Sequence, residues 1–94
     1  MANYAQKSYK KRFLTKLGKR FSFVMVEHVS YFYSEGGMTF LVQNDSDRRQ
    51  LISHTLNELE SELLDPMTYY RVNRSMIINS ESLAEIKPYL NSRV

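Results

Sequence analysis

The chain reads Tyr69-Tyr70-Arg71-Val72-Asn73-Arg74-Ser75-Met76-Ile77-Ile78-Asn79 in the stretch from which its fold is inferred. Residues 69–72 and 76–78 are rich in strand-forming side chains, and they flank a short polar loop. The stretch holds two arginines, an asparagine and a serine between an aromatic pair and an apolar run. Arginine and asparagine are the side chains that read base edges and clamp phosphates, so this pattern favours a nucleic acid as the ligand.

Just upstream, the sequence predicts one short amphipathic helix, over about residues 55–65. Thr55 and Glu58 have the spacing of a capping box, which marks the helix start. Pro66 disfavours helical geometry in the residue before it and so marks the end. Leucines recur between these signals at helical spacing: Leu56, Leu59 and Leu63, with Leu64 widening the apolar face.

The rest of the chain predicts short strands separated by turns, typical of a mainly β fold with sandwich-like strand spacing. Glu35-Gly36-Gly37 is the strongest turn signal, because paired glycines tolerate positive φ. A turn is also predicted at Glu27-His28. The strands predicted outside the opening stretch are 12–17, 20–26, 29–34, 38–43, 48–52 and 82–89.

Length and composition indicate one small globular domain. The chain has 94 residues, 43% of them hydrophobic and 24% charged. It contains no cysteine, which excludes disulfides, cysteine zinc sites and thiol nucleophiles and fits a reducing compartment. There is no secretory signal pattern and no apolar run of membrane-spanning length, so a cytoplasmic protein without membrane contact is expected.

Positive charge is concentrated at the N-terminal end, although the net charge is only +3. A polyanion such as nucleic acid would be attracted to this end, while a solvated surface is the plain alternative. Residues 1–10 are polar and predict a linker or flexible arm, with the domain itself over residues 11–94. The basic residues that precede the first acidic residue, Glu27, are Lys7, Lys10, Lys11, Arg12, Lys16, Lys19 and Arg20.

Catalysis has little support in the sequence. His28 and His54 lack metal-ligand spacing and are more typical of surface or capping positions. No serine lies in a nucleophile elbow, and Gly36-Gly37 by itself predicts a turn and not a phosphate loop. We therefore expect no enzyme activity, no metal and no cofactor.

Four aromatic residues have two possible roles. A platform that stacks on the bases of single-stranded RNA is one possibility. Filling the core of a small β domain is the other, and it is favoured because the rings alternate with apolar residues and no Arg or Lys is interleaved among them. These residues are Tyr31, Phe32, Tyr33 and Phe40.

The order of motifs resembles that of LytTR-type DNA-binding domains, the output modules of bacterial response regulators. Residues 29–42 resemble the family's tyrosine-containing strand, turn and following strand. Residues 56–63, which read Leu-Asn-Glu-Leu-Glu-Ser-Glu-Leu, resemble its leucine helix. The opening stretch resembles its arginine signature, with Asn73 where the family usually has histidine. Each motif is moderately specific, and their order along the chain makes the resemblance strong.

The resemblance implies an elongated β module that sets loops, instead of a recognition helix, into the major grooves of promoter DNA. Gly37, Met38 and Thr39 would then form one reading loop, with Thr39 at a base-contacting position. Asn73, Arg74, Ser75 and Arg71 would form the second. Arg74 would grip guanine, Asn73 would pair with adenine or hold a phosphate, and Ser75 would hold a phosphate. For Arg71 a structural ion pair is an equal alternative.

The chain departs from the family in two further ways. Gly36-Gly37 leaves the first loop with few side-chain atoms, so contact with the DNA backbone is expected there. The family usually continues beyond this point with further strands and a third DNA contact. Because the sequence ends at Val94, we expect the C-terminal strands to be absent.

The partners that the resemblance implies are double-stranded promoter DNA, the receiver domain of a full-length regulator and, on repeated sites, a second copy of the chain. Two other functions remain open from the residues alone. One is a protein-interaction or self-association module that uses exposed sheet edges. The other is the single-stranded RNA binder that the tyrosine-rich strand suggests.

Overall fold

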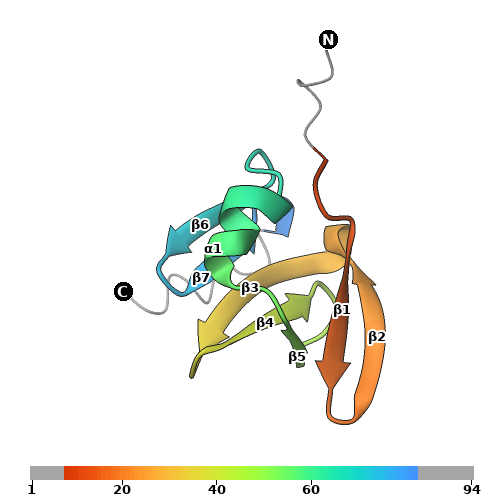
Figure 1. The fold of residues 1–94 in the computed structure, drawn as a ribbon. Coiled ribbons are helices and arrows are strands. Elements are labelled where there is room, and N and C mark those ends of the chain that lie inside the picture. The colour runs from red at the N-terminus through yellow and green to blue at the C-terminus, as the bar shows by residue number, and fades with distance from the viewer. Residues whose placement is uncertain (1–7, 83–94) are drawn as a thin grey trace.

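The computed structural model describes residues 8–82, and within them seven strands form a single antiparallel sheet (Figure 1). Its strand order is β2-β1-β5-β4-β3-β7-β6. The strands are β1 (Arg12–Leu17), β2 (Arg20–Met25), β3 (Val29–Glu35), β4 (Met38–Gln43), β5 (Arg49–Ile52), β6 (Tyr69–Asn73) and β7 (Met76–Asn79). The prediction of a mainly β module with one short helix is confirmed.

The predicted element boundaries agree with the structure to within about one residue at most strand ends. The turn expected at Glu27-His28 is a 3-10 helix, Val26–His28. Ser82, where a last strand was predicted to begin, belongs instead to the 3-10 helix Ser80–Ser82. Residues 83–89 of that predicted strand lie outside the described residues. The expected absence of the family's C-terminal strands also concerns a part of the chain that lies outside them.

The helix begins as predicted and then changes its hydrogen-bond pattern. α1 (Leu56–Glu58) continues directly into a π-helical segment, Leu59–Leu63, and the Leu64 N–H donates to the Leu59 carbonyl at 2.9 Å. In an α-helix two residues five apart would point about 140° from each other. The wider π turn brings them closer to one direction, and Leu59 and Leu64 are both buried.

The main core lies between the helix and one face of the sheet. Strand alternation sends Phe32 of β3 into this core, where its ring lies edge-on to Phe13 at 5.4 Å and to Tyr69 at 6.0 Å. The buried cluster draws on β1 to β7 and the helix: Phe13, Val24, Val29, Phe32, Leu41, Ile52, Leu56, Leu59, Leu64, Tyr69 and Ile77. This packing holds the helix against β3 and β6, and Figure 1 shows it beside these strands.

The predicted aromatic core is only partly observed. Phe32 is buried in the core as expected, but Tyr31, Tyr33 and Phe40 lie on the opposite face of the sheet. Side chains alternate between the two faces along β3, and Phe40 of β4 is the cross-strand partner of Tyr33. No Arg or Lys is interleaved with these rings in the sequence, but the fold brings one to them. Arg49 lies 4.3 Å from the Phe40 ring centre, and it comes from β5, a strand that sequence proximity does not connect to β3.

The N-terminal part of the described chain is attached to the domain. The Lys10 N–H donates to the Leu63 carbonyl at 2.9 Å, and the Lys11 carbonyl accepts from the Val26 N–H at 2.8 Å. The boundary between arm and domain at residue 10 stays a prediction. Among residues 8–82 no helix is long and apolar enough to cross a membrane.

The capping box predicts a pH dependence of stability. The Thr55 N–H donates to the Glu58 carboxylate at 2.9 Å, and the Glu58 N–H donates to the Thr55 hydroxyl at 3.1 Å. The first of these hydrogen bonds is the main reason that the pKa of Glu58 is lowered. A lowered folded-state pKa means that this stabilisation is complete above the unfolded pKa and is lost as pH falls through the folded one.

We expect Glu58→Gln to flatten the loss of unfolding free energy in urea titrations between about pH 6 and pH 3, because glutamine can keep the cap without titrating. Thr55→Ala should cost about 1 kcal/mol at neutral pH. Glu62→Gln, on an exposed glutamate of the same helix, is the control. The same acid dependence in Glu58→Gln and in the native chain would contradict a role for the cap.

Candidate nucleic-acid interface

Two hairpin ends and the start of the helix meet at one end of the sheet. Strand β3 pairs with β4 on one side and with β7 on the other, so the turn after β3 lies beside the loop before β7. The Ser34 N–H donates to the Ser75 carbonyl at 3.0 Å and joins the two directly. An open groove of about 440 Å³ runs between them, lined by Ser34, Glu35, Gly36, Gly37, Thr39, Thr55, Leu56, Asn57, Arg71, Arg74 and Ser75.

The first wall of the groove is a glycine turn without side chains. Gly36 and Gly37 have φ of +60° and +80°, the left-handed geometry that a two-residue type I′ hairpin turn requires at both positions. A Cβ built at either position would meet no atom within 4 Å, so the backbone conformation, and not crowding, calls for glycine. The turn therefore leaves its backbone open to close approach by a ligand.

The predicted residues of the first loop divide between the two faces of β4. Thr39 lines the groove but is only 7% exposed, because it lies between Ser34 of β3 and Ile52 of β5. Met38 alternates to the other face and is exposed there, outside the groove. The groove therefore brings together Gly37 and Thr39 of this loop but not Met38.

The second wall is the loop between β6 and β7. Asn73 folds this loop locally, since its Oδ1 accepts from the Ser75 N–H at 2.8 Å. Arg74 is exposed and lines the groove, and within residues 8–82 its guanidinium has no hydrogen bond or ion pair. Arg74 is thus a cation held at the groove with its donors available to a ligand.

Arg71 is held inside the protein by contacts of all three guanidinium nitrogens. Nε donates to the Asn73 carbonyl at 3.2 Å and Nη2 to the Arg74 carbonyl at 2.7 Å. Nη1 donates to Asn57 Oδ1 at 2.6 Å and to Glu60 Oε1 at 3.0 Å, and the side chain is 19% exposed. The structural ion pair considered for Arg71 is confirmed, and the side chain ties the loop to the helix.

Sequence reasoning missed Asn57 and Glu60 as the partners of Arg71. Glu60 lies among the charged positions of the helix, and a lone helical asparagine gives no signal in the sequence. The only available clue was that a cation at a strand end needs acceptors nearby. The helix supplies them because it packs across β3 and reaches β6.

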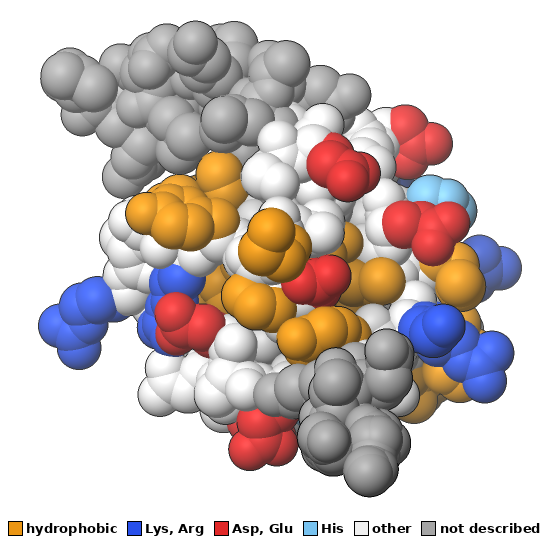
Figure 2. Space-filling model, turned by 90° about the horizontal axis from the view of Figure 1, so that it is seen from above, with side chains coloured by type: hydrophobic (Ala, Val, Ile, Leu, Met, Phe, Trp, Pro, Cys, Tyr) orange, Lys and Arg blue, Asp and Glu red, His pale blue; other side chains and the backbone are white. Residues whose placement is uncertain are grey.

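Charge near the groove is mixed. Glu35 of the first hairpin pairs with Arg49 at 3.0 Å, and Glu60 pairs with Arg71, so both carboxylates are partly compensated. On the face of the molecule in Figure 2, acidic side chains are scattered and Lys and Arg lie toward the two sides. Of the two arginines that line the groove, Arg74 is the one that forms no ion pair with a carboxylate of the described residues.

The two histidines take structural positions. The His54 ring packs edge-on to Phe13 at 5.9 Å, and its Nδ1 lies 3.9 Å from the Glu58 carboxylate. His28 ends the short 3-10 helix before β3. In the part of the chain that the structure describes, no group of His, Asp and Glu is arranged to hold a metal ion.

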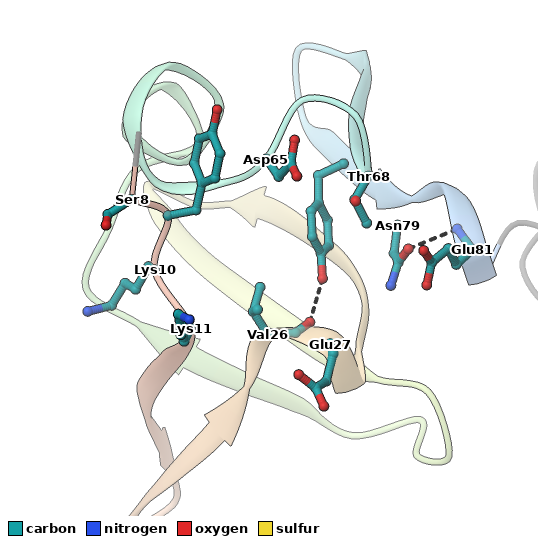
Figure 3. Close-up of a pocket in the computed structure, with 11 residues that line it drawn as sticks. Ser8, Lys10, Lys11, Val26, Glu27, Asp65, Thr68, Asn79 and Glu81 are labelled. Carbon is teal, nitrogen blue, oxygen red and sulfur yellow. Dashed lines mark hydrogen bonds between the residues drawn. The ribbon is translucent and has the colours of Figure 1, made fainter. Parts of the chain in front are cut away.

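A second hollow, of about 480 Å³, lies where residues 8–11 pass β6, and its polar floor is used for internal bonds (Figure 3). The Tyr69 hydroxyl donates to the Val26 carbonyl, and burial is the main reason that the pKa of Tyr69 is raised. Asn79 donates to the Val29 carbonyl at 3.1 Å and accepts from the Glu81 N–H at 2.8 Å. These bonds join the segments that surround the hollow.

The Arg71 network predicts a local effect. In Arg71→Ala the loop 73–75 loses its charge-assisted hydrogen bonds, so its amides should open about 5–30-fold more often, as expected for about 1–2 kcal/mol. Hydrogen exchange followed by NMR measures this, with Ser75 and Ser34 as reporters. Arg48→Ala removes an exposed arginine elsewhere and serves as control.

Unchanged exchange at Ser75 in Arg71→Ala would show that the loop holds its shape without the arginine. A rise in exchange at every core amide would instead indicate general destabilisation.

The chain is similar in sequence and in fold to proteins of one family. The family model of the LytTr DNA-binding domain matches residues 19–94. Among solved structures, the fold is similar to a chain from Bacillus cereus named as the LytTr DNA-binding domain of a methyl-accepting/DNA response regulator, with a TM-score of 0.68 and 22% identity. The match covers 77% of this chain and 63% of that one. Among curated proteins, none is similar enough to match. Because the family model spans most of the sequence, the chain belongs to the LytTr DNA-binding domain family.

Proposed function

We propose that this domain binds double-stranded promoter DNA in a sequence-specific way, through the groove end of the sheet. The glycine turn of residues 36–37 would approach the sugar-phosphate backbone, which its missing side chains allow. The loop of residues 73–75 would enter the neighbouring major groove. Family membership supports DNA binding, and the geometry supports this division of roles between the two loops.

The observation that carries the proposal is the contrast between Arg71 and Arg74. Arg71 lies in β6 and Arg74 in the loop that follows it. The guanidinium of Arg71 donates its hydrogen bonds to groups of the protein, whereas that of Arg74 does not. A guanidinium that is available, and whose backbone is held in place, can form two parallel hydrogen bonds to guanine O6 and N7. We assign base reading to Arg74 and positioning to Arg71.

The other predicted residues take secondary roles in this proposal. Asn73 and Ser75 would contact phosphate or an adjacent base, since they share the exposed loop. Thr39, nearly buried, would support the groove wall and offer its hydroxyl only at close approach. Met38 and Gly37 would lie at the margin of the contact.

The wider biological assignment is also a proposal. We place the domain in the bacterial cytoplasm as the output part of a two-component response regulator, controlled by a receiver domain and able to pair with a second copy on repeated sites. Support comes from the similarity to a domain of a response regulator.

Binding of single-stranded RNA has weaker support. The rings of Tyr33 and Phe40 pack on each other at 5.4 Å, and Arg49 lies over Phe40 at 4.3 Å. Phe40 is only 7% exposed, so little of its ring is open to a base. A stacking platform needs open ring faces.

Duplex selection from a random DNA pool tests the proposal. Arg74→Ala should bind the preferred site about 1–3 kcal/mol more weakly and should relax the preference at one position of the motif. Arg48→Ala, which removes the same charge from an exposed site outside the groove, should leave the motif unchanged. Work at moderate salt keeps nonspecific phosphate binding from hiding the difference.

An unchanged motif in Arg74→Ala, with an affinity loss no larger than in Arg48→Ala, would remove Arg74 from base reading. Absence of any enriched motif for the native chain would overturn sequence-specific binding by this domain.

A further inference from the structure

The β1–β2 hairpin exposes a row of large apolar side chains that neither the core nor the DNA groove uses. Phe21 and Phe23 of β2 are 65% and 60% exposed. Cross-strand pairing of Phe23 with Leu14, and strand alternation, set these side chains on one face of the hairpin. Exposed apolar side chains that are contiguous mark interaction surfaces more often than single exposed ones do. The members of this row, here called the hairpin face, are Leu14, Phe21, Phe23 and Met25.

The hairpin face is surrounded by positive charge. The Arg12 guanidinium lies 4.5 Å from the Phe23 ring centre, and Lys16 Nζ lies 5.7 Å from that of Phe21. Lys19 and Arg20 stand at the turn and the start of β2. Residues 12–25 contain no aspartate or glutamate. The hairpin is thus both apolar and basic.

β2 is also the last strand on its side of the sheet. In the order β2-β1-β5-β4-β3-β7-β6 its inner side pairs with β1 along the whole strand. Among residues 8–82 no strand pairs with its outer side. In Figure 1 the hairpin extends away from the part of the sheet that lies beside the helix, with β2 at the outer edge. A free strand edge can accept an extended peptide by backbone hydrogen bonding.

We propose that the outer edge of β2 binds an extended segment of a partner protein that carries both apolar and acidic side chains. The backbone of the segment would add a strand to the sheet. Its apolar side chains would cover Phe21 and Phe23, and its carboxylates would meet Arg20 and the turn. This surface is separate from the DNA groove and goes beyond the proposed function.

Charge favours this occupant over a second copy of the chain. Two copies meeting at β2 would bring together two hairpins that each carry Arg12, Lys16, Lys19 and Arg20 and no carboxylate. Basic side chains at an edge strand are a common barrier to such pairing. An acidic segment turns the same charges into attraction.

Ring geometry favours protein over single-stranded nucleic acid at this face. A cation lies over the ring of each of Phe21 and Phe23, so part of each ring surface is already engaged within the protein and is not open to a base. What remains exposed includes Leu14 and Met25, which are aliphatic. Such a surface suits packing by aliphatic side chains.

Binding of defined peptides tests the proposal. The probe is a fluorescent peptide of about ten residues that alternates valine and glutamate, which is long enough to pair along the whole of β2. Fluorescence anisotropy should show saturable binding to the native chain. The double variant Phe21→Ser, Phe23→Ser should bind at least about tenfold more weakly, as expected when anchor side chains are removed. Both rings are exposed, so these substitutions should leave the fold intact.

Three controls identify the cause. Met67→Ser removes a side chain that is 86% exposed elsewhere and should bind the peptide as the native chain does. A peptide with lysine in place of glutamate tests charge, and one with a central proline tests strand addition; both should bind at least about tenfold more weakly. Duplex DNA binding by the double variant should be unchanged, which separates this surface from the groove.

Several results would overturn the proposal. They are no saturable binding of the acidic peptide, equal binding of the lysine or proline peptide, or equal binding by the double variant. Tighter binding of oligothymidine than of the peptide, lost in the double variant, would assign the face to single-stranded nucleic acid. Sedimentation that shows a dimer lost in the double variant would assign it to a second copy.

Discussion

The double pairing of β3 is the constraint on which the rest of this structure depends. This strand is hydrogen-bonded to β4 on one side and to β7 on the other, and its Phe32 is at the centre of the core. Antiparallel pairing on both sides forces the turn after β3 and the loop before β7 to the same end of the sheet. The groove exists because these two connections are neighbours, although about forty residues separate them in the chain.

Arg71 then fixes the conformation of the loop between β6 and β7 at the groove. A five-donor guanidinium that bonds to two loop carbonyls and to two helix side chains fixes the loop against the helix. The helix is in turn held by its buried leucines and its capping box. The core holds the helix, the helix holds Arg71, and Arg71 holds the loop that carries Arg74. The backbone of Arg74 is therefore supported by rigid elements, as a specific binding site requires.

The two faces of the sheet have different roles. One face is sealed by the helix and forms the core. The other carries Tyr31, Tyr33 and Phe40 in its middle, covered by their mutual packing and by Arg49, and becomes exposed at the β1–β2 hairpin. Exposed rings under cations, at the end of a sheet and away from the groove, are the basis of our proposal that the β1–β2 hairpin binds a partner.

The sequence by itself determined the elements and the family. Local signals are sufficient for this: Gly36-Gly37 needs its turn, Thr55 and Glu58 cap the helix, and the leucines repeat at helical spacing. The arginine stretch, read with these motifs, indicated DNA binding. Only the tertiary structure decided which residues face the groove, because that depends on pairings between distant strands and on which face each one buries. It separated Arg71 from Arg74, buried Thr39, turned Met38 away, and brought Arg49 onto Phe40. Alternation along a strand gives two possible faces, and only packing against the rest of the chain selects between them.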